Sequence, residues 1–302
     1  MRGIKLPHAK HTVVALISTL VLSTLAVTGG TALALLGEGH LSPQQSVAAV
    51  VAFPQPVTNT PTLVGTAAII FDPTNGRILY AKNADAQLPL ASITKLMTAE
   101  IVLSSESPET PVTITQSALA PEAGSGLKVG DVIPLNQLLQ LGLIASSNDA
   151  MEAAAESLGP DYLVHMNQTA QNLGLAKTYF LNPTGLDVNA DTSGAYSSAY
   201  DVARLAATFY KQYPTFFVQT QRKSVSIEIG NRTLTKEATD APLLSIPGLV
   251  GAKTGYTDLA GGNLVAIFDV EIGHPLVAVI LGSTRDGRFT DIKTLIATAR
   301  KN

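Results

Sequence analysis

Apolar positions in the middle of the chain recur at helical spacing. After Pro89, which discourages an earlier helix, Ile93, Leu96, Met97 and Ile101 fall on one helical face. The same period predicts the helices of the middle of the chain, at residues 92–103, 135–145, 148–158, 162–173 and 198–210. The middle of the chain is therefore expected to be mostly helical.

The period changes after Pro247, where short apolar or alternating runs replace the helical spacing. These runs predict antiparallel strands at residues 249–256, 263–270 and 276–281, followed by a helix at 288–300. An earlier β-hairpin is predicted from strands at 66–71 and 78–80, because the Asn75-Gly76 pair between them favours a tight turn.

Strands at both ends with helices between them predict a mixed α/β fold of the α+β type. We expect an antiparallel sheet flanked by helices, with a helical subdomain. The N-terminal hairpin would complete a sheet that the C-terminal strands mainly form.

The N-terminus carries an export pattern. Arg2, Lys5 and Lys10 precede an uncharged, largely apolar run at residues 12–36, and such basic residues keep the N-terminus in the cytoplasm. The run of about 25 residues exceeds the roughly 20 that span a bilayer, which favours a retained anchor. A cleaved signal peptide stays open, because Ala32-Leu33-Ala34 has small residues at cleavage-type spacing. The expected location is extracytoplasmic, anchored to the membrane or secreted.

A linker is predicted after this segment. Residues 39–71 contain no Asp, Glu, Lys or Arg, and prolines punctuate them at Pro43, Pro54, Pro56 and Pro61. We therefore divide the chain into a cytoplasmic tip with anchor or signal at 1–38, a linker at 39–65 and one folded domain at 66–302. Docking of the apolar stretch 47–53 on that domain is the alternative to an extended linker.

Composition excludes several classes of function. The chain has 302 residues of which 46% are hydrophobic, which is sufficient for a sizeable core. Its net charge of −3 gives no basic field, so nucleic acid is not an expected partner. The absence of cysteine from the sequence excludes a thiol nucleophile and a cysteine zinc site.

Histidine is too scarce to supply a Ser/His/Asp triad. Of the five histidines, His8, His11 and His40 precede the folded domain, and His165 and His274 are expected at surface or structural positions. No His/Glu spacing indicates a metal site, and neither a metal nor an organic cofactor is implied.

A serine and a lysine offer an alternative chemistry. Ser92-Ile93-Thr94-Lys95 places a hydroxyl and an amine three positions apart, on one helical face. A serine hydroxyl is inert unless a base takes its proton, and a crowded, cationic pocket can lower a lysine pKa enough for this. The start of the helix adds a positive potential at Ser92. Alone, this pattern is weak, because it occurs by chance in many proteins.

Two further motifs make the Ser92–Lys95 pattern stronger evidence for a catalytic site. Ser146-Ser147-Asn148 lies between two predicted helices, where such residues also serve as helix caps. Lys253-Thr254-Gly255 lies in a late strand, where a cation followed by glycine is common at a sheet edge. All three motifs in this order, each on its own kind of element, predict one catalytic site.

With these motifs, the chain resembles the serine penicillin-recognising acyltransferases and, within them, the D-Ala-D-Ala carboxypeptidase family of low-molecular-mass penicillin-binding proteins. The resemblance covers roughly residues 66–300 and is carried also by the stretches 90–99, 127–131, 182–187 and 251–257. It implies a β-lactamase/transpeptidase-like fold and a D,D-peptidase catalytic domain at 66–302. The chain departs from the family at Ser147, often Gly, and at Tyr256, often His.

The resemblance implies a role for each motif residue. Ser92 would be the acylated nucleophile, Lys95 its general base and Ser146 the hydroxyl that relays a proton towards the leaving D-alanine. Asn148 would hold the substrate amide.

Other residues would bind the substrate. Lys253, Thr254 and Gly255 would face it from an edge strand, and Arg288 would bind its carboxylate, with Arg285 as the alternative. The backbone N–H groups of Ser92 and Tyr256 would form the oxyanion hole.

The expected function is removal of the terminal D-Ala from peptidoglycan stem peptides, with β-lactams as covalent inhibitors. A D,D-endopeptidase of the same family is the main alternative, since it needs identical catalytic residues. A β-lactamase is less favoured, because no matching Glu-x-x-Leu-Asn is present. An inactive wall-binding protein is disfavoured by the complete motifs.

Overall fold

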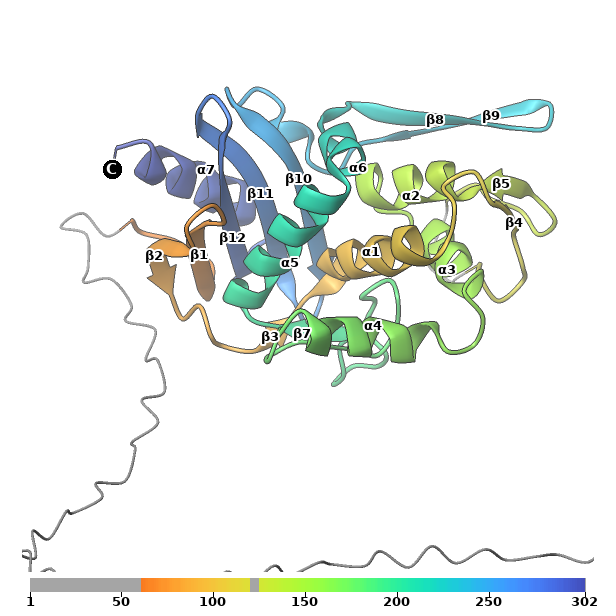
Figure 1. Cartoon of the computed structure of the whole chain (residues 1–302), viewed down its shortest axis with the longest axis horizontal. Coiled ribbons are helices and arrows are strands. Elements are labelled where there is room, and N and C mark those ends of the chain that lie inside the picture. The colour runs from red at the N-terminus through yellow and green to blue at the C-terminus, as the bar shows by residue number, and fades with distance from the viewer. Residues whose placement is uncertain (1–60, 120–124, 302) are drawn as a thin grey trace, which may run out of the picture. The chain divides into compact units, whose positions relative to one another are not determined.

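A five-stranded antiparallel sheet forms the centre of the computed structural model, which describes residues 61–119 and 125–301. Its strand order is β10-β11-β12-β1-β2. The bounds are β1 (Ala67–Asp72), β2 (Arg77–Lys82), β10 (Leu249–Thr257), β11 (Gly261–Glu271) and β12 (His274–Ser283). Ala67 lies opposite Leu281, so the N-terminal hairpin completes the C-terminal sheet as predicted. The predicted mixed α/β class is confirmed (Figure 1).

Both faces of the sheet are covered, which explains why β1 is buried throughout. Ala67, Ile69 and Phe71 belong to one apolar cluster, whereas Ala68 and Ile70 belong to the other. This alternation follows from the two-residue period of a strand.

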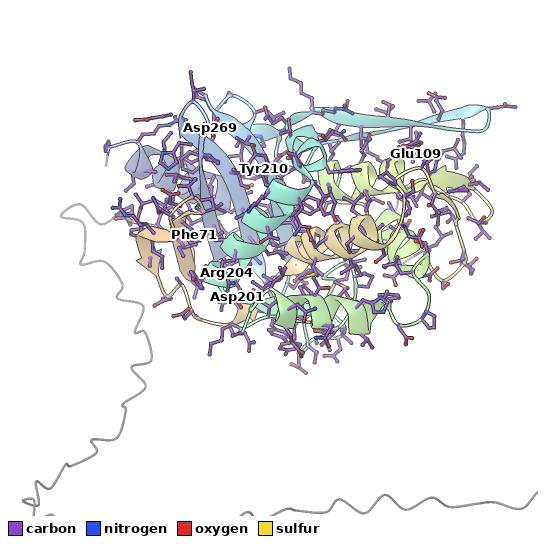
Figure 2. All side chains as sticks on the ribbon, viewed as in Figure 1. Phe71, Glu109, Asp201, Arg204, Tyr210 and Asp269 are labelled. Carbon is purple, nitrogen blue, oxygen red and sulfur yellow. The ribbon has the colours of Figure 1, made fainter. Side chains whose placement is uncertain are left out.

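Helices supply the two outer layers. Helix α7 (Gly287–Ala299) packs on one face through Ile292 and Leu295. Helix α5 (Ala199–Gln212) packs on the opposite face, where the Phe71 and Tyr200 rings meet edge to face with centroids 6.0 Å apart (Figures 1 and 2).

A helical subdomain adjoins the sheet, as predicted. It contains α1 (Lys95–Ser105), α2 (Leu135–Ile144), α3 (Asn148–Glu156) and α4 (Tyr162–Asn172), with the short hairpin β4 (Pro111–Thr113) and β5 (Val132–Pro134) beside them. The boundaries agree with the predicted helices except at 92–103. There the chain first forms a 3-10 turn, η1 (Ala91–Thr94), and the α-helix begins only at Lys95.

The middle of the chain is mostly helical as expected, but residues 224–237, for which no element was predicted, are an exception. These residues form the hairpin β8 (Ser224–Ile229) and β9 (Arg232–Glu237), which extends along α2 (Figure 1). Val225, Ile227 and Ile229 are buried and alternate with exposed residues, so the period of the strand is present in the sequence.

The remaining elements are short. They are β3 (Leu88–Pro89), β6 (Tyr179–Phe180), β7 (Ala195–Ser197), α6 (Pro214–Val218), η2 (Gln219–Gln221) and η3 (Ala241–Leu243). Strand β3 pairs with β7 immediately before the Ser92 turn and so fixes the entry of the chain into that turn.

The first described residues pack against α7. Leu63 is buried, and the backbone N–H groups of Val64 and Gly65 donate to the Asp291 carboxylate at 3.0 and 2.8 Å. The predicted anchor or signal and the linker through residue 60 lie outside the described residues. Within 61–119 and 125–301, no helix is both long enough and apolar enough to cross a membrane.

Candidate active site

Ser92 and Lys95 are in direct contact. Lys95 Nζ lies 2.6 Å from Ser92 Oγ, within hydrogen-bond distance. Ser92 is on the 3-10 turn η1, and Lys95 is the first residue of α1. The three-residue spacing therefore brings the hydroxyl and the amine together, although the turn that does so is tighter than predicted.

Two glycines allow the backbone to close around Ser92. Gly185 has a φ of +79°, and a Cβ there would lie 1.9 Å from the Ala91 carbonyl oxygen. A Cβ at Gly255 would lie 3.1 Å from the Ser92 backbone nitrogen. Side chains at these positions would displace the turn, so both glycines are needed for close approach.

The Lys95 ammonium is held by two further acceptors. Its Nζ donates to Asn148 Oδ1 and to the Thr184 carbonyl oxygen, each at 2.8 Å. Asn148 begins α3, and Thr184 belongs to a turn in which Asn182 Oδ1 accepts from the Gly185 N–H at 2.7 Å. The side chain of Asn148 thus contacts the lysine.

Burial makes Lys95 a stronger candidate for a base. The residue is fully buried, and this desolvation holds its pKa well below the usual range for lysine. The nearby Lys253 lowers the pKa further, whereas Glu152 raises it. A lowered pKa increases the neutral fraction of the amine, which is the form that accepts a proton.

Ser146 is connected to the third motif. Lys253 Nζ donates to Ser146 Oγ at 2.8 Å and to the Thr254 carbonyl oxygen at 3.0 Å. Ser146 has a φ of +60°, an unusual conformation for a residue other than glycine. The helix cap of α3 is Ser147, whose Oγ accepts from the Ala150 N–H, so the cap role does not fall on Ser146.

Lys253, Thr254 and Gly255 lie on β10, at an end of the sheet order. Thr254 Oγ1 donates to Thr239 Oγ1 at 2.6 Å. Lys253 is buried, and this desolvation lowers its pKa to about 7. Among the other influences on this pKa, Asp240 raises it and Arg288 lowers it.

The two candidate arginines behave differently. Arg288, on α7, is buried and donates from Nη1 to the Gly255 carbonyl oxygen at 2.5 Å. Arg285 stacks on the Tyr256 ring, with its guanidinium carbon 4.0 Å from the ring centroid. Both therefore lie beside the end of β10, but only Arg288 contacts the backbone of the third motif.

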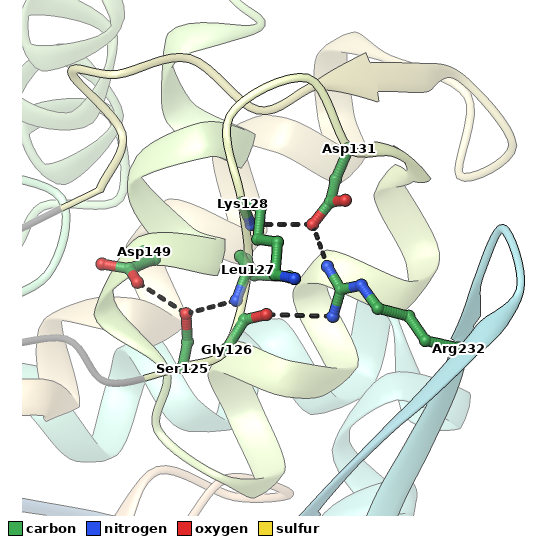
Figure 3. Close-up of polar contacts among 7 residues, drawn as sticks. All are labelled: Ser125, Gly126, Leu127, Lys128, Asp131, Asp149 and Arg232. Carbon is green, nitrogen blue, oxygen red and sulfur yellow. Dashed lines mark hydrogen bonds and ion pairs between the residues drawn. The ribbon is translucent and has the colours of Figure 1, made fainter.

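Residues 125–131, of which 127–131 resemble the family's segment before the second motif, are held by contacts with Asp149 and with Arg232 (Figure 3). Ser125 Oγ donates to Asp149 Oδ2 at 2.5 Å, next to Asn148 in sequence. Arg232, at the start of β9, donates to the Gly126 carbonyl oxygen at 3.0 Å and forms an ion pair with Asp131. The β8–β9 hairpin thus holds residues 126–131 against the subdomain.

Several groups near the site were not predicted from the sequence. They are the Thr184 carbonyl, Thr239, Asp240 and Glu152. A backbone carbonyl leaves no residue-type signal, and the other three are single polar residues outside any recognisable motif. Only the fold brings them near the two lysines.

The two described histidines, His165 and His274, lie on other elements than the three motifs. His274 Nε2 lies 2.9 Å from Asp72 Oδ2, and His165 is exposed on α4. His8, His11 and His40 lie outside the described residues. Within those residues, no group of three or more His, Asp or Glu side chains could hold a metal ion.

The fold and the three motifs define a class of serine-type peptidases, and solved structures share this fold. Penicillin-binding protein D2 from Listeria monocytogenes in its ampicillin-bound form has a TM-score of 0.71 and 29% sequence identity. That match covers 80% of this chain and 98% of the other. The same protein in its cefotaxime-bound form has a TM-score of 0.70 and 31% sequence identity, and the match again covers 80% of this chain and 98% of the other.

Residues 55–285 match the family Peptidase_S11, D-alanyl-D-alanine carboxypeptidase. The chain belongs to this family of serine-type peptidases. It is 33% identical over 283 residues to D-alanyl-D-alanine carboxypeptidase DacD of Salmonella typhimurium, covering 87% of this chain and 68% of the relative. It is also 33% identical over 229 residues to a D-alanyl-D-alanine endopeptidase of Pseudomonas aeruginosa, covering 72% of each.

Proposed function

We propose that the chain removes the terminal D-Ala from peptidoglycan stem peptides through an acyl-enzyme on Ser92. The observation that carries this proposal is the 2.6 Å contact between Ser92 Oγ and the buried Lys95 Nζ. The Lys253–Ser146 contact at 2.8 Å supports it, because it joins the second and third motifs and brings a second hydroxyl next to a cation.

Acylation begins with proton transfer from Ser92 Oγ to the neutral amine of Lys95. The Ser92 oxygen attacks the carbonyl carbon of the penultimate D-Ala and forms a tetrahedral intermediate. Backbone N–H groups of Ser92 and Tyr256 stabilise its oxyanion. The close approach of Gly255 to the Ser92 nitrogen supports this pairing of donors.

The leaving amine needs a proton when its bond to carbon breaks. Ser146 gives its proton to the D-alanine nitrogen, and a proton returns to Ser146 from the Lys95 side. Water then attacks the Ser92 ester, which releases the shortened peptide and restores the serine hydroxyl. Lys95 again serves as base in this second step.

Substrate is held along β10. The edge strand lets the peptide backbone lie alongside Thr254 and Gly255 as an added strand. Asn148 binds a substrate amide, and Lys253 and Arg288 attract the terminal carboxylate. Burial of both cations supports the last role, since desolvated charges interact more strongly.

A D,D-endopeptidase is the second candidate, favoured by the 33% identity to the Pseudomonas aeruginosa endopeptidase. It would cut a cross-link with the same catalytic residues. The difference between the two activities would lie in the shape of the substrate groove.

The location follows from the substrate. Peptidoglycan is extracytoplasmic, and residues 1–38 would export the domain and anchor it to the membrane, or be cleaved as a signal. β-Lactams would acylate Ser92, in line with the ampicillin-bound and cefotaxime-bound neighbours.

Incubation with a pentapeptide ending in D-Ala-D-Ala and with a cross-linked dimer, followed by mass spectrometry, tests the proposal. Release of D-alanine from the pentapeptide is expected, with loss of release in Ser92→Ala. Ser104→Ala, at the far end of α1, is the matched control and should retain activity. Cleavage of the dimer alone would establish the endopeptidase, and unchanged release by Ser92→Ala would overturn the acyl-enzyme.

A further inference from the structure

Asp240 is a buried acid whose burial is costly. Its side chain is 2% exposed, and neither carboxylate oxygen has a hydrogen-bond partner in another described residue. Removing a carboxylate from water without pairing it costs several kcal/mol. Such a group needs a nearby opposite charge if it is to remain ionised.

The backbone around Asp240 is fixed to two of the catalytic motifs. The N–H of Thr239 donates to the Ile144 carbonyl oxygen at 3.1 Å, two residues before Ser146. Thr239 Oγ1 accepts from Thr254 Oγ1 at 2.6 Å, next to Lys253. Asp240 then begins the turn η3, in which its carbonyl oxygen accepts from the Leu243 N–H. Asp240 therefore lies where the second and third motifs meet.

Charged groups from three elements act on Lys253. Arg288 from α7 lowers its pKa, and Lys95 from α1 is close enough for the two lysines to interact. Asp240, before η3, is the carboxylate that raises the pKa of Lys253. In return, Lys253 lowers the pKa of Asp240, which burial raises to about 7.

We propose that Asp240 is a positioning residue that supplies the counter-charge for the Lys253 ammonium and so keeps this cation available for the substrate carboxylate. The two cations Lys253 and Arg288 would otherwise repel each other in a desolvated site. The role of Lys253 towards the substrate carboxylate rests on the proposed carboxypeptidase function. The electrostatic coupling of Asp240 to Lys253 does not.

The first test uses Asp240→Asn, which keeps the size of the side chain and removes its charge. Loss of this opposite charge from the buried site should lower the Lys253 pKa by about one unit. We therefore expect KM for a D-Ala-D-Ala peptide to begin rising at a pH about one unit lower than in the wild type, with kcat less affected. An unchanged pH profile of KM would overturn the proposal.

Asp201→Asn is the matched control. Asp201 is also a buried acid, on α5, and it accepts from the Lys177 N–H at 2.7 Å. This variant should lose stability while its pH profile of KM stays that of the wild type. An equal shift of the profile in both variants would assign the effect to general destabilisation and overturn the inference.

A second measurement needs neither substrate nor a folded Asp240 variant. Carbon NMR titration of the Asp240 carboxyl is compared between the wild type and Lys253→Met. We expect the Asp240 pKa to rise in Lys253→Met, because its counter-charge is gone. An unchanged titration would overturn the coupling, whereas absence of D-alanine release by the wild type would overturn only the proposed function.

Discussion

The hydroxyl of Ser92 and the amine of Lys95 lie 2.6 Å apart, and the amine has no exposure to solvent. The lysine is also held by Asn148 and the Thr184 carbonyl, which fix its position beside Ser92. A base that is fixed and desolvated before substrate binds needs little reorganisation during proton transfer.

Replacing Lys95 with Ala should therefore abolish efficient acylation. A positioned base contributes roughly 10²- to 10⁴-fold, and we expect the rate of labelling by a fluorescent penicillin to fall by about that factor. Stopped-flow or gel-based labelling measures it. Lys293→Ala, an exposed lysine on α7, should label at the wild-type rate. Normal labelling of Lys95→Ala would remove the lysine from the mechanism.

Gly185→Ala should destabilise the fold and slow acylation together. The new Cβ would meet the Ala91 carbonyl oxygen at 1.9 Å, in a residue that already has φ +79°. We expect a loss of about 3 kcal/mol or more, since overpacking adds to backbone strain.

Gly76→Ala is the matched control for that strain. Gly76 has φ +74°, but no atom lies within 4 Å of an added Cβ. Gly76→Ala should lower the free energy of unfolding by only about 1–2 kcal/mol, because of the left-handed backbone alone, and should not affect acylation. Urea unfolding measures both variants, and equal losses would contradict the close-packing argument.

Arg288→Gln should erase preference for a free carboxylate. Hydrogen bonds to charged groups contribute about 1.5–3 kcal/mol, so kcat/KM for a D-Ala-D-Ala peptide should fall roughly 10- to 100-fold. The corresponding D-alaninamide peptide should be affected less. Arg285→Gln provides the comparison, and a larger loss of carboxylate preference in that variant would assign the carboxylate to Arg285.

Glu100→Gln should stabilise the protein in a pH-dependent way. Glu100 is buried on α1, and burial raises its pKa to about 7. The unfolded carboxyl has a pKa near 4.3, so the folded state binds more protons between these values. Stability from this group is therefore lost as pH rises from about 4 to 7.

Neutralising Glu100 should remove this cost. The variant is expected to gain about 2–3 kcal/mol at pH 8 and nothing at pH 4, measured by urea unfolding at both values. Glu271→Gln removes an exposed carboxylate and should leave the free energy of unfolding unchanged at both pH values. A gain at pH 4 equal to that at pH 8 would exclude the titration of Glu100 as its cause.

Much of the fold could be predicted because apolar residues recur at clear helical or strand spacing along the chain. The turn at Asn75-Gly76 and the apolar runs after Pro247 predicted the sheet, and the spacing in 135–173 predicted the helices. The β8–β9 hairpin was not predicted, although Val225, Ile227 and Ile229 alternate with less buried residues. Contacts join Ser92 to Lys95 and Ser146 to Lys253, and the elements that carry these residues could be identified from the sequence.

The local geometry of the site could not be read in the same way. Ser92 lies on a 3-10 turn that begins at Ala91, which has a φ of +48°, and Gly185 and Gly255 let neighbouring segments approach this turn. Asp240 is equally invisible in sequence, because its burial and the link from its neighbour Thr239 to Thr254 arise only in the fold. These features depend on contacts between segments distant along the chain.

The pairing of β1 with β12 has a consequence for biosynthesis. Ala67 cannot meet Leu281 until nearly the whole chain has been made, and contacts between such distant segments slow folding. Until then β1 has only β2 as a neighbour, and its apolar edge is open to aggregation. A ribosome-bound or truncated chain would therefore need protection by a chaperone, and the enzyme would mature in one late step.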